Sequence, residues 1–215
     1  MLTHQKFVYL QIPHTGNAWV TLALKRIAGD SRLLKHPEST TYSEAPGRIV
    51  NRTPFAFVRN PWQWYLVLYA TNRFLRKSGI GPFQTDNKQQ QDFLNDRFGG
   101  SFRQMLDHLE NTSESLLHSV VQRYTEKPYE TAPDVQLLKF EDGLPDTLLR
   151  FLHQLDIQTT PVVENQVRYH QPFHETRVDL TLVDEYFVQW VARHDAAYIQ
   201  QHGYTPPAGF ELTGD

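Results

Sequence analysis

Two short apolar runs, each broken by a proline-containing loop before a helical pattern, constrain the fold of this chain most strongly. The first run, Phe7–Ile12, stops at Pro13, and apolar residues at helical spacing follow over residues 18–27. The second run, Pro54–Val58, stops at Arg59-Asn60-Pro61 before a helical stretch rich in aromatic residues. Proline suits the first turn of a helix and ends a strand. Each run therefore predicts a strand, a tight loop and a helix.

The rest of the chain continues this alternation. A third strand is expected over 135–140, and helices over 62–74, 89–98, 101–110, 145–155 and, as one long amphipathic helix, 180–201. Residues 30–52 are expected to be mostly loop, and the glycine-containing segment 78–88 is a candidate lid. Alternating strands and helices over 215 residues predict an α/β fold. We expect a single domain, residues 1–215, with a central parallel β-sheet flanked by helices.

Composition narrows the classes of function. The net charge of −3 argues against a broadly basic nucleic-acid surface but allows a local pocket for one small anion. The absence of cysteine excludes disulfides, thiolate catalysis and a cysteine-based zinc site. The first ten residues contain Lys6 and no long apolar run, so they resemble neither a signal peptide nor a membrane anchor. The default expectation is a cytoplasmic protein with no membrane or nucleic-acid partner.

The loop after the first run is a candidate anion site. It contains Pro13, His14, Thr15, Gly16, Asn17, Ala18 and Trp19. A helix N-terminus presents free backbone N–H groups and the positive end of the helix dipole, so phosphate or sulfate suits it. Gly16 lets the backbone approach an anion, and Thr15 offers a hydroxyl donor. The alternative is an ordinary turn without ligand. The loop lacks the Gly-Lys-Ser/Thr ending of the standard P-loop.

At these residues the sequence resembles the sulfotransferase family. Ile12–Trp19 is similar to the family's first motif, Ile-Pro-Lys-Thr/Ser-Gly, which wraps the 5′-phosphosulfate of PAPS (3′-phosphoadenosine 5′-phosphosulfate). Residues 55–62 with Leu68-Tyr69 are similar to its second motif, a strand leading into Val-Arg-Asn-Pro-Trp. Two weaker similarities, at 137–142 and 195–204, follow in order. Together they span nearly the whole chain and imply a P-loop-NTPase-like sulfotransferase fold.

The resemblance also implies an activity and a set of roles. The chain is expected to transfer a sulfuryl group from PAPS to a hydroxyl or amine of a small molecule or carbohydrate, leaving PAP, without a metal. Residues 13–19 hold the phosphosulfate and Arg59 the 3′-phosphate, a role suited to a bidentate guanidinium. The alternative for Arg59 is a structural ion pair.

Departures from the family pattern bear on catalysis. His14 replaces a lysine that stabilises charge on the leaving oxygen, and a neighbouring phosphosulfate would raise the pKa of the imidazole toward the cation. Val67 replaces a serine that helps to hold the 3′-phosphate, and Gln63-Trp64 replace an acid–arginine pair. These replacements keep open weak PAPS binding, a different anionic nucleotide, or a site without catalysis.

The acceptor hydroxyl needs a base, and His36 is our candidate because it lies between the two nucleotide motifs. Glu38 and Glu44 are nearby alternatives, and His36 as a plain surface residue is another.

Three other groups are expected to be structural. The basic turn 76–79 fits a solvated helix end better than a second phosphate contact. His170 and His174 have metal-ligand spacing, but Pro172 disfavours the helix that would bring them together, so no metal site is expected. Trp62, Trp64 and Tyr69 fit a core better than an adenine-stacking role.

Two other functions compete with the enzyme. One is a non-catalytic sulfotransferase-fold protein that binds a nucleotide or a partner. The other is a P-loop kinase-like enzyme, which the missing Walker lysine and magnesium-binding hydroxyl disfavour. In the family interpretation, Thr15 and Arg59 should face one cleft at the carboxyl ends of neighbouring parallel strands.

Overall fold

The computed structural model describes residues 1–29, 32–37, 40–47, 51–77, 101–111, 116–168 and 178–212. Residue contacts group the chain into two compact units, residues 1–59 with 121–173 and residues 60–120 with 174–215. One domain over residues 1–215 stays a prediction.

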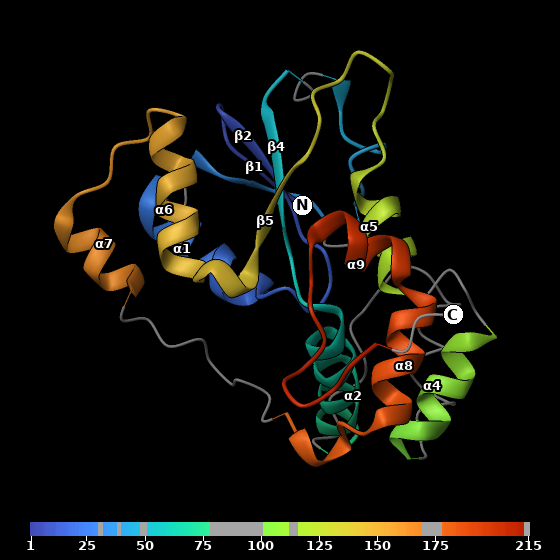
Figure 1. Cartoon of the computed structure of the whole chain (residues 1–215). Coiled ribbons are helices and arrows are strands. Elements are labelled where there is room, and N and C mark those ends of the chain that lie inside the picture. The colour runs from blue at the N-terminus through green and yellow to red at the C-terminus, as the bar shows by residue number, and fades with distance from the viewer. Residues whose placement is uncertain are drawn as a thin grey trace. The chain divides into compact units, whose positions relative to one another are not determined.

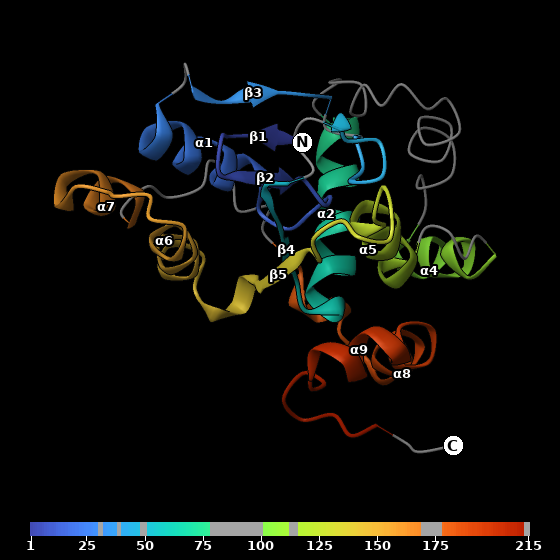
Figure 2. The ribbon, with the colours of Figure 1, turned by 90° about the horizontal axis from the view of Figure 1, so that it is seen from above.

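The first unit contains a five-stranded sheet. Its strands are β1 (Leu2–Thr3), β2 (Phe7–Leu10), β3 (Leu34–Lys35), β4 (Thr53–Val58) and β5 (Gln136–Lys139), in the order β3-β1-β2-β4-β5. Figure 2 shows this succession from β3 to β5. The strands β2, β4 and β5 are parallel, while β1 is antiparallel to both β2 and β3.

The expectation of a purely parallel sheet is therefore wrong, and the sheet is mixed. Only three residues separate Thr3 from Phe7. A parallel connection needs a crossover of about a dozen residues or more. A link of this length can therefore only form an antiparallel hairpin. The hairpin turn is closed by the N–H of His4, which donates to the carbonyl of Phe7 at 2.9 Å.

Helices of the same unit cover one face of this sheet. They are α1 (Asn17–Ala28), α6 (Leu144–Gln154) and α7 (Pro161–Arg168), and the short 3₁₀ helix η4 (Phe140–Asp142) leads from β5 into α6. Phe7 and Tyr9 on β2 alternate with Val8 and Leu10, and all four are buried. The aromatic face of the strands packs against α1 and α6, which lie beside the sheet in Figure 1. This core fixes the strand ends that carry the site.

The sequence located these elements closely. The predicted strands over 7–12, 54–58 and 135–140 correspond to β2, β4 and β5, and the helices over 18–27 and 145–155 to α1 and α6. The predicted loop 30–52 contains the short β3. The candidate lid over 78–88 and the helix over 89–98 lie outside the described residues.

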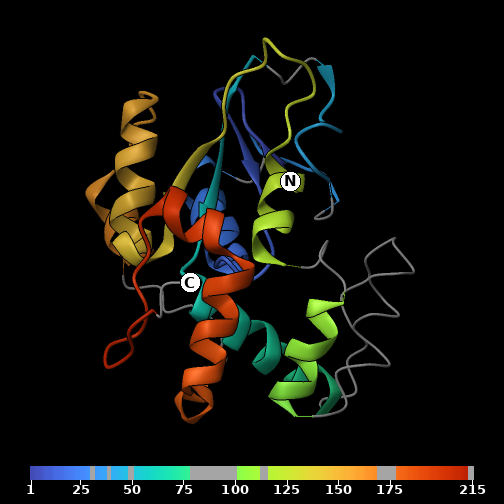
Figure 3. The same cartoon turned by 45° about the vertical axis from the view of Figure 1, so that its right-hand side comes forward.

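The second unit is helical. It contains α2 (Pro61–Lys77), α4 (Phe102–Glu110), the beginning of α5 (Leu117–Thr125), the 3₁₀ helix η5 (Leu180–Leu182), α8 (Glu185–His194) and α9 (Ala196–His202). The expectation of one long helix over 180–201 is wrong, because η5, α8 and α9 are separate. Figure 3 shows α8 and α9 as distinct helices.

The break between α8 and α9 is built around Asp195. Its fully buried carboxylate accepts a hydrogen bond from the hydroxyl of Tyr65 at 2.6 Å and one from the N–H of His118 at 2.8 Å. The N–H of Leu117 donates to the Tyr65 oxygen at 3.1 Å. Burial raises the pKa of Asp195, and burial together with the Asp195 charge raises that of Tyr65 well above its usual value. This buried network joins α2 to the start of α5 and to the α8–α9 corner.

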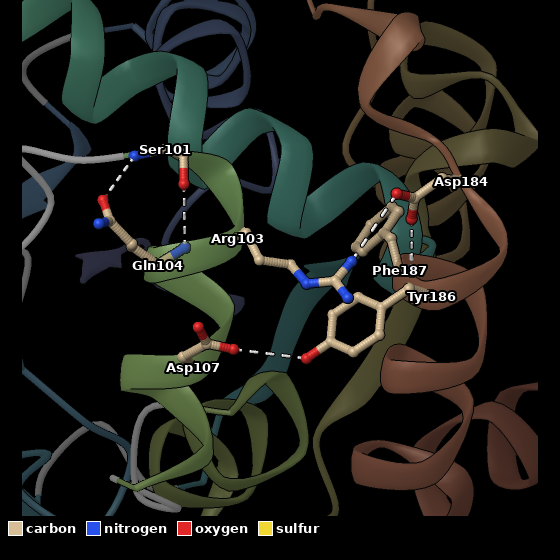
Figure 4. A network of polar contacts seen from close by, with 7 residues as sticks. All are labelled: Ser101, Arg103, Gln104, Asp107, Asp184, Tyr186 and Phe187. Atoms are coloured by element: carbon tan, nitrogen blue, oxygen red, sulfur yellow. Dashed lines mark hydrogen bonds and ion pairs between the residues drawn. The ribbon is translucent and has the colours of Figure 1, made fainter.

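A second polar network joins α4 to α8, as Figure 4 shows. The guanidinium of Arg103 lies 3.0 Å from the centre of the Tyr186 ring and 3.8 Å from the carboxylate of Asp184. The Tyr186 hydroxyl donates to Asp107 at 3.4 Å. Beneath these exposed contacts, the rings of Phe102 and Phe187 meet edge to face at 4.9 Å. The apolar contact carries most of the stabilisation here, because exposed ion pairs contribute little.

Candidate functional site

The β2–α1 loop and Arg59 meet at one edge of the sheet. The strands β2 and β4 are parallel neighbours, with Leu10 opposite Ala56, so the loop after β2 and the residue after β4 emerge together. A side-chain N–H of Arg59 donates to the carbonyl of His14 at 3.4 Å. The expected position of this loop and Arg59 at one carboxyl edge is thus found, while a cleft between Thr15 and Arg59 stays a prediction.

The loop is held in place from beneath. The Thr15 hydroxyl donates to the carbonyl of Ile12 at 2.7 Å, and the Asn17 amide donates to the same carbonyl at 2.8 Å. The hydroxyl of Tyr9 donates to the Asn17 side chain at 2.7 Å. Thr15 is buried, and its single hydroxyl hydrogen is donated to the carbonyl of Ile12. Thr15 can therefore offer an anion its backbone N–H but not its side chain.

Glycine is required at position 16. Gly16 has φ 88°, a left-handed conformation that other residues rarely adopt, and it precedes the first residue of α1. A Cβ at this position would lie 3.0 Å from the ring of Phe140 and 3.1 Å from Leu144. His14 also has a positive φ, 63°. The backbone thus turns sharply on both sides of Thr15 to reach the helix N-terminus.

His14 is neutral in this structure at pH 7. It keeps some exposed surface, yet burial among its neighbours, and secondarily the charge of Arg59, lower its pKa to about 4. The expected cation at this position would therefore have to be produced by a bound anion.

The other predicted loop residues differ in how far their side chains are exposed to solvent. Ala18 is exposed, Pro13 is half-buried, and the Trp19 side chain is buried in the core. Trp19 is therefore placed to contribute its backbone to the site, while its indole packs inside the protein.

His36 lies two strands away from the loop, just after β3. Its ring nitrogen Nε2 is 3.3 Å from the hydroxyl oxygen of Thr3, and its N–H donates to the carbonyl of Met1 at 2.9 Å. The order β3-β1-β2 puts the end of β3 about 10 Å from β2. The structure thus places His36 at the same edge of the sheet as the loop, two strands away from it.

Glu44 and Glu38 are the alternative candidates for the base. Glu44 accepts hydrogen bonds from the N–H and hydroxyl of Thr41 at 2.8 and 3.0 Å, so its carboxylate holds a local turn. Glu38 lies outside the described residues, as do His170, His174 and the end of the basic turn 76–79.

The remaining residues of the second motif lie in the second unit. Trp62 and Trp64 are buried, and Tyr69 meets the ring of Phe102 edge to face at 5.2 Å. Val67 is half-buried on α2. Trp62 and Trp64 thus have the core role that the sequence favours, while Tyr69 is half-buried.

The sequence analysis included Phe140 in the weaker similarity at 137–142 but gave it no role at the site. Its ring lies against Gly16, and the guanidinium of Arg59 lies over it, 4.2 Å from its centre. The reason lies in the strand register: Val58 is opposite Lys139 in the parallel pair β4–β5, so Arg59 and Phe140, which directly follow these strands, are neighbours. Without the strand order that register could not be known.

Neither a metal cluster nor a membrane-spanning helix is found in the part of the chain that the structure describes. Within it, no three His, Asp or Glu side chains are gathered in a way that could hold a metal ion. Nor does any described helix combine the length and apolar character needed to cross a bilayer.

Comparison with known proteins gave no relative: no family model, no curated protein and no solved structure matches the chain.

Proposed function

We propose that this chain is a sulfotransferase-like enzyme that binds PAPS and transfers its sulfuryl group to a hydroxyl or amine of a small molecule or carbohydrate. The supporting observation is the meeting of a helix N-terminal loop with Arg59 at the carboxyl edge of parallel strands. Backbone N–H groups and a guanidinium at one point favour a ligand with more than one anionic group. PAPS is such a ligand, with a 5′-phosphosulfate and a 3′-phosphate.

In the proposed reaction the acceptor oxygen or nitrogen forms a bond to sulfur as the bond between sulfur and the bridging oxygen breaks. PAP leaves with the bridging electron pair, and the acceptor proton passes to a base, for which His36 is the candidate. Residues 13–19 would orient the phosphosulfate, with Arg59 on the 3′-phosphate. Catalysis would rest on positioning and on charge stabilisation.

His14 determines whether this charge stabilisation is available. Raising a pKa from about 4 to 7 requires about three units, or roughly 4 kcal/mol of favourable interaction with the bound anion. A buried phosphosulfate against the ring is the kind of partner that supplies energies of this order.

The same property of His14 favours a second candidate, a non-catalytic protein that binds the nucleotide. A neutral imidazole and an inward Thr15 hydroxyl leave the loop able to bind an anion through its backbone, without a group that stabilises the leaving oxygen.

Calorimetry with PAP, PAPS and ATP, followed by a transfer assay over a panel of acceptors, separates these functions. Binding of PAP and PAPS with sulfuryl transfer supports the enzyme. Binding of both without transfer supports the non-catalytic protein. Binding of ATP alone, or of none of the three, contradicts the proposal.

A further inference from the structure

The ring of Phe140 links two parts of the candidate site. Phe140 follows β5 directly, at the carboxyl edge of the sheet and next to Arg59, which follows β4 directly. The guanidinium of Arg59 lies 4.2 Å from the centre of this ring, within the range of a cation–π contact. The same guanidinium donates to the carbonyl of His14. Arg59 is thus placed between the ring and the loop.

The Phe140 ring also contacts the loop, at Gly16. A Cβ at Gly16 would lie only 3.0 Å from the Phe140 ring, so the ring is seated directly on the loop backbone. Leu144 at the start of α6 lies against the same position. The Phe140 ring is therefore held in place against the loop, and it can in turn hold the Arg59 guanidinium that lies over it.

We infer that Phe140 is a positioning residue, whose ring holds the Arg59 guanidinium over the β2–α1 loop. Resting on the proposed function, this has a consequence for the ligand: the fixed guanidinium is what favours a nucleotide with a 3′-phosphate over one without it. An arginine side chain has several rotatable bonds, and restricting them before binding improves affinity for the group it meets.

Phe140 is also half-buried against the core, so a loss of function on mutation could report packing alone. The two roles differ in their dependence on Arg59. If Phe140 positions Arg59, mutating Phe140 has no further effect on the site once Arg59 is replaced. If Phe140 only packs in the core, its mutation has the same effect with and without Arg59.

The first measurement needs no ligand. His14 is titrated by NMR in the parent, in Phe140→Leu, in Arg59→Gln and in the double variant. Because the Arg59 charge lowers the pKa of His14, losing that charge or letting it move away shifts the pKa upward. We expect Phe140→Leu to raise the pKa in the parent background and to change it little in the Arg59→Gln background.

Equal shifts in both backgrounds, or no shift in either, would overturn the inference. Phe140→Tyr keeps the ring and should behave as the parent. Phe151→Leu is the matched control. It replaces a buried ring of the same core, whose centre lies 4.3 Å from that of the Phe55 ring. It should leave the pKa of His14 unchanged. If Phe140→Leu does not fold, Phe140→Met, whose unbranched side chain adapts more readily to an irregular space, replaces it.

The second measurement compares PAP with AMP, which differs from PAP by the 3′-phosphate alone. Phe140→Leu should weaken PAP binding about 3- to 10-fold, the size of a cation–π contact, and leave AMP binding unchanged. An equal loss for both nucleotides would contradict the role in 3′-phosphate preference. If the parent binds neither nucleotide, the proposed function fails, while the His14 titration still decides whether Phe140 positions Arg59.

Discussion

Among single residues, His14 separates the enzyme from the binding protein. If a bound phosphosulfate converts it to the cation, PAPS affinity should fall as pH rises through the bound-state pKa, because deprotonation removes a favourable charge. His14→Lys should then hold or improve turnover at pH 8, measured by sulfuryl transfer. Parent-like PAPS binding by His14→Lys and His14→Ala at every pH, with no transfer by any of the three proteins, would leave His14 as a loop residue only.

Arg59 carries the second prediction at this scale. Arg59→Ala should weaken PAP binding by about 1.5 to 3 kcal/mol, or roughly 10- to 150-fold, because it removes charge-assisted hydrogen bonds to phosphate. Calorimetry measures the change. Arg150→Ala is the control, since it removes the same charge from an exposed position on α6 of the same unit. Unchanged PAP affinity in Arg59→Ala would exclude Arg59 from the site.

The residues of the loop were predictable from sequence, but their contacts were not. The strand–Pro13–Gly16–helix pattern locates a helix N-terminus, and the structure has it there. The direction of the Thr15 hydroxyl depends on the carbonyl of Ile12, which accepts its hydrogen bond. The role of Phe140 depends on a contact with Gly16, 124 positions earlier in the sequence. Local patterns carry no information on such contacts.

At the scale of elements, the corner between α8 and α9 should depend on Asp195 more than on an ordinary helix cap. Asp195→Ala leaves the Tyr65 hydroxyl and the His118 N–H without their buried acceptor, and we expect a loss of about 3 kcal/mol or more in the free energy of unfolding. Urea denaturation followed by circular dichroism measures it.

Asp184→Ala is the matched comparison. Asp184 is the exposed N-cap of α8 and accepts from the N–H of Phe187 at 2.8 Å, so its removal should cost about 1 kcal/mol. Equal losses for Asp195→Ala and Asp184→Ala would contradict the structural role of the buried network.

The same corner shows where element prediction fails. Apolar residues recur at helical spacing on both sides of Asp195, so the sequence favours one continuous helix. The break is made by the buried hydrogen bonds of Asp195 to Tyr65 and His118, which lie far away in the sequence. The strands β1 and β3 were missed for a different reason, because two residues are too few for a periodic pattern.

For the whole molecule, stability should decline in acid because two histidines are held neutral. Burial, with the charges of Arg32, Arg52 and Lys6, lowers the pKa of His4, and burial with Arg59 lowers that of His14 from 6.5 to about 4. Between about pH 6.5 and 4 the unfolded chain binds protons that the folded chain does not. The free energy of unfolding should therefore fall as pH is lowered through this window, by up to about 3 kcal/mol from His14.

Urea denaturation at pH 7 and pH 4.5 tests this dependence. His14→Gln should flatten the fall, since glutamine does not titrate. His153→Gln is the control, because it removes a histidine whose side chain is half-exposed and lies 3.3 Å from Glu164. The same acid dependence in His14→Gln as in the parent would show that His14 contributes nothing to it.

The central claim is that one anionic nucleotide binds the β2–α1 loop and Arg59 together, and NMR titration of the labelled protein with PAP tests it most directly. The prediction is saturable shifts of the backbone amides of residues 15–19 and of the Arg59 side-chain N–H, which report the same dissociation constant. Saturable PAP binding that leaves these signals unchanged, or no binding at all, would contradict the account.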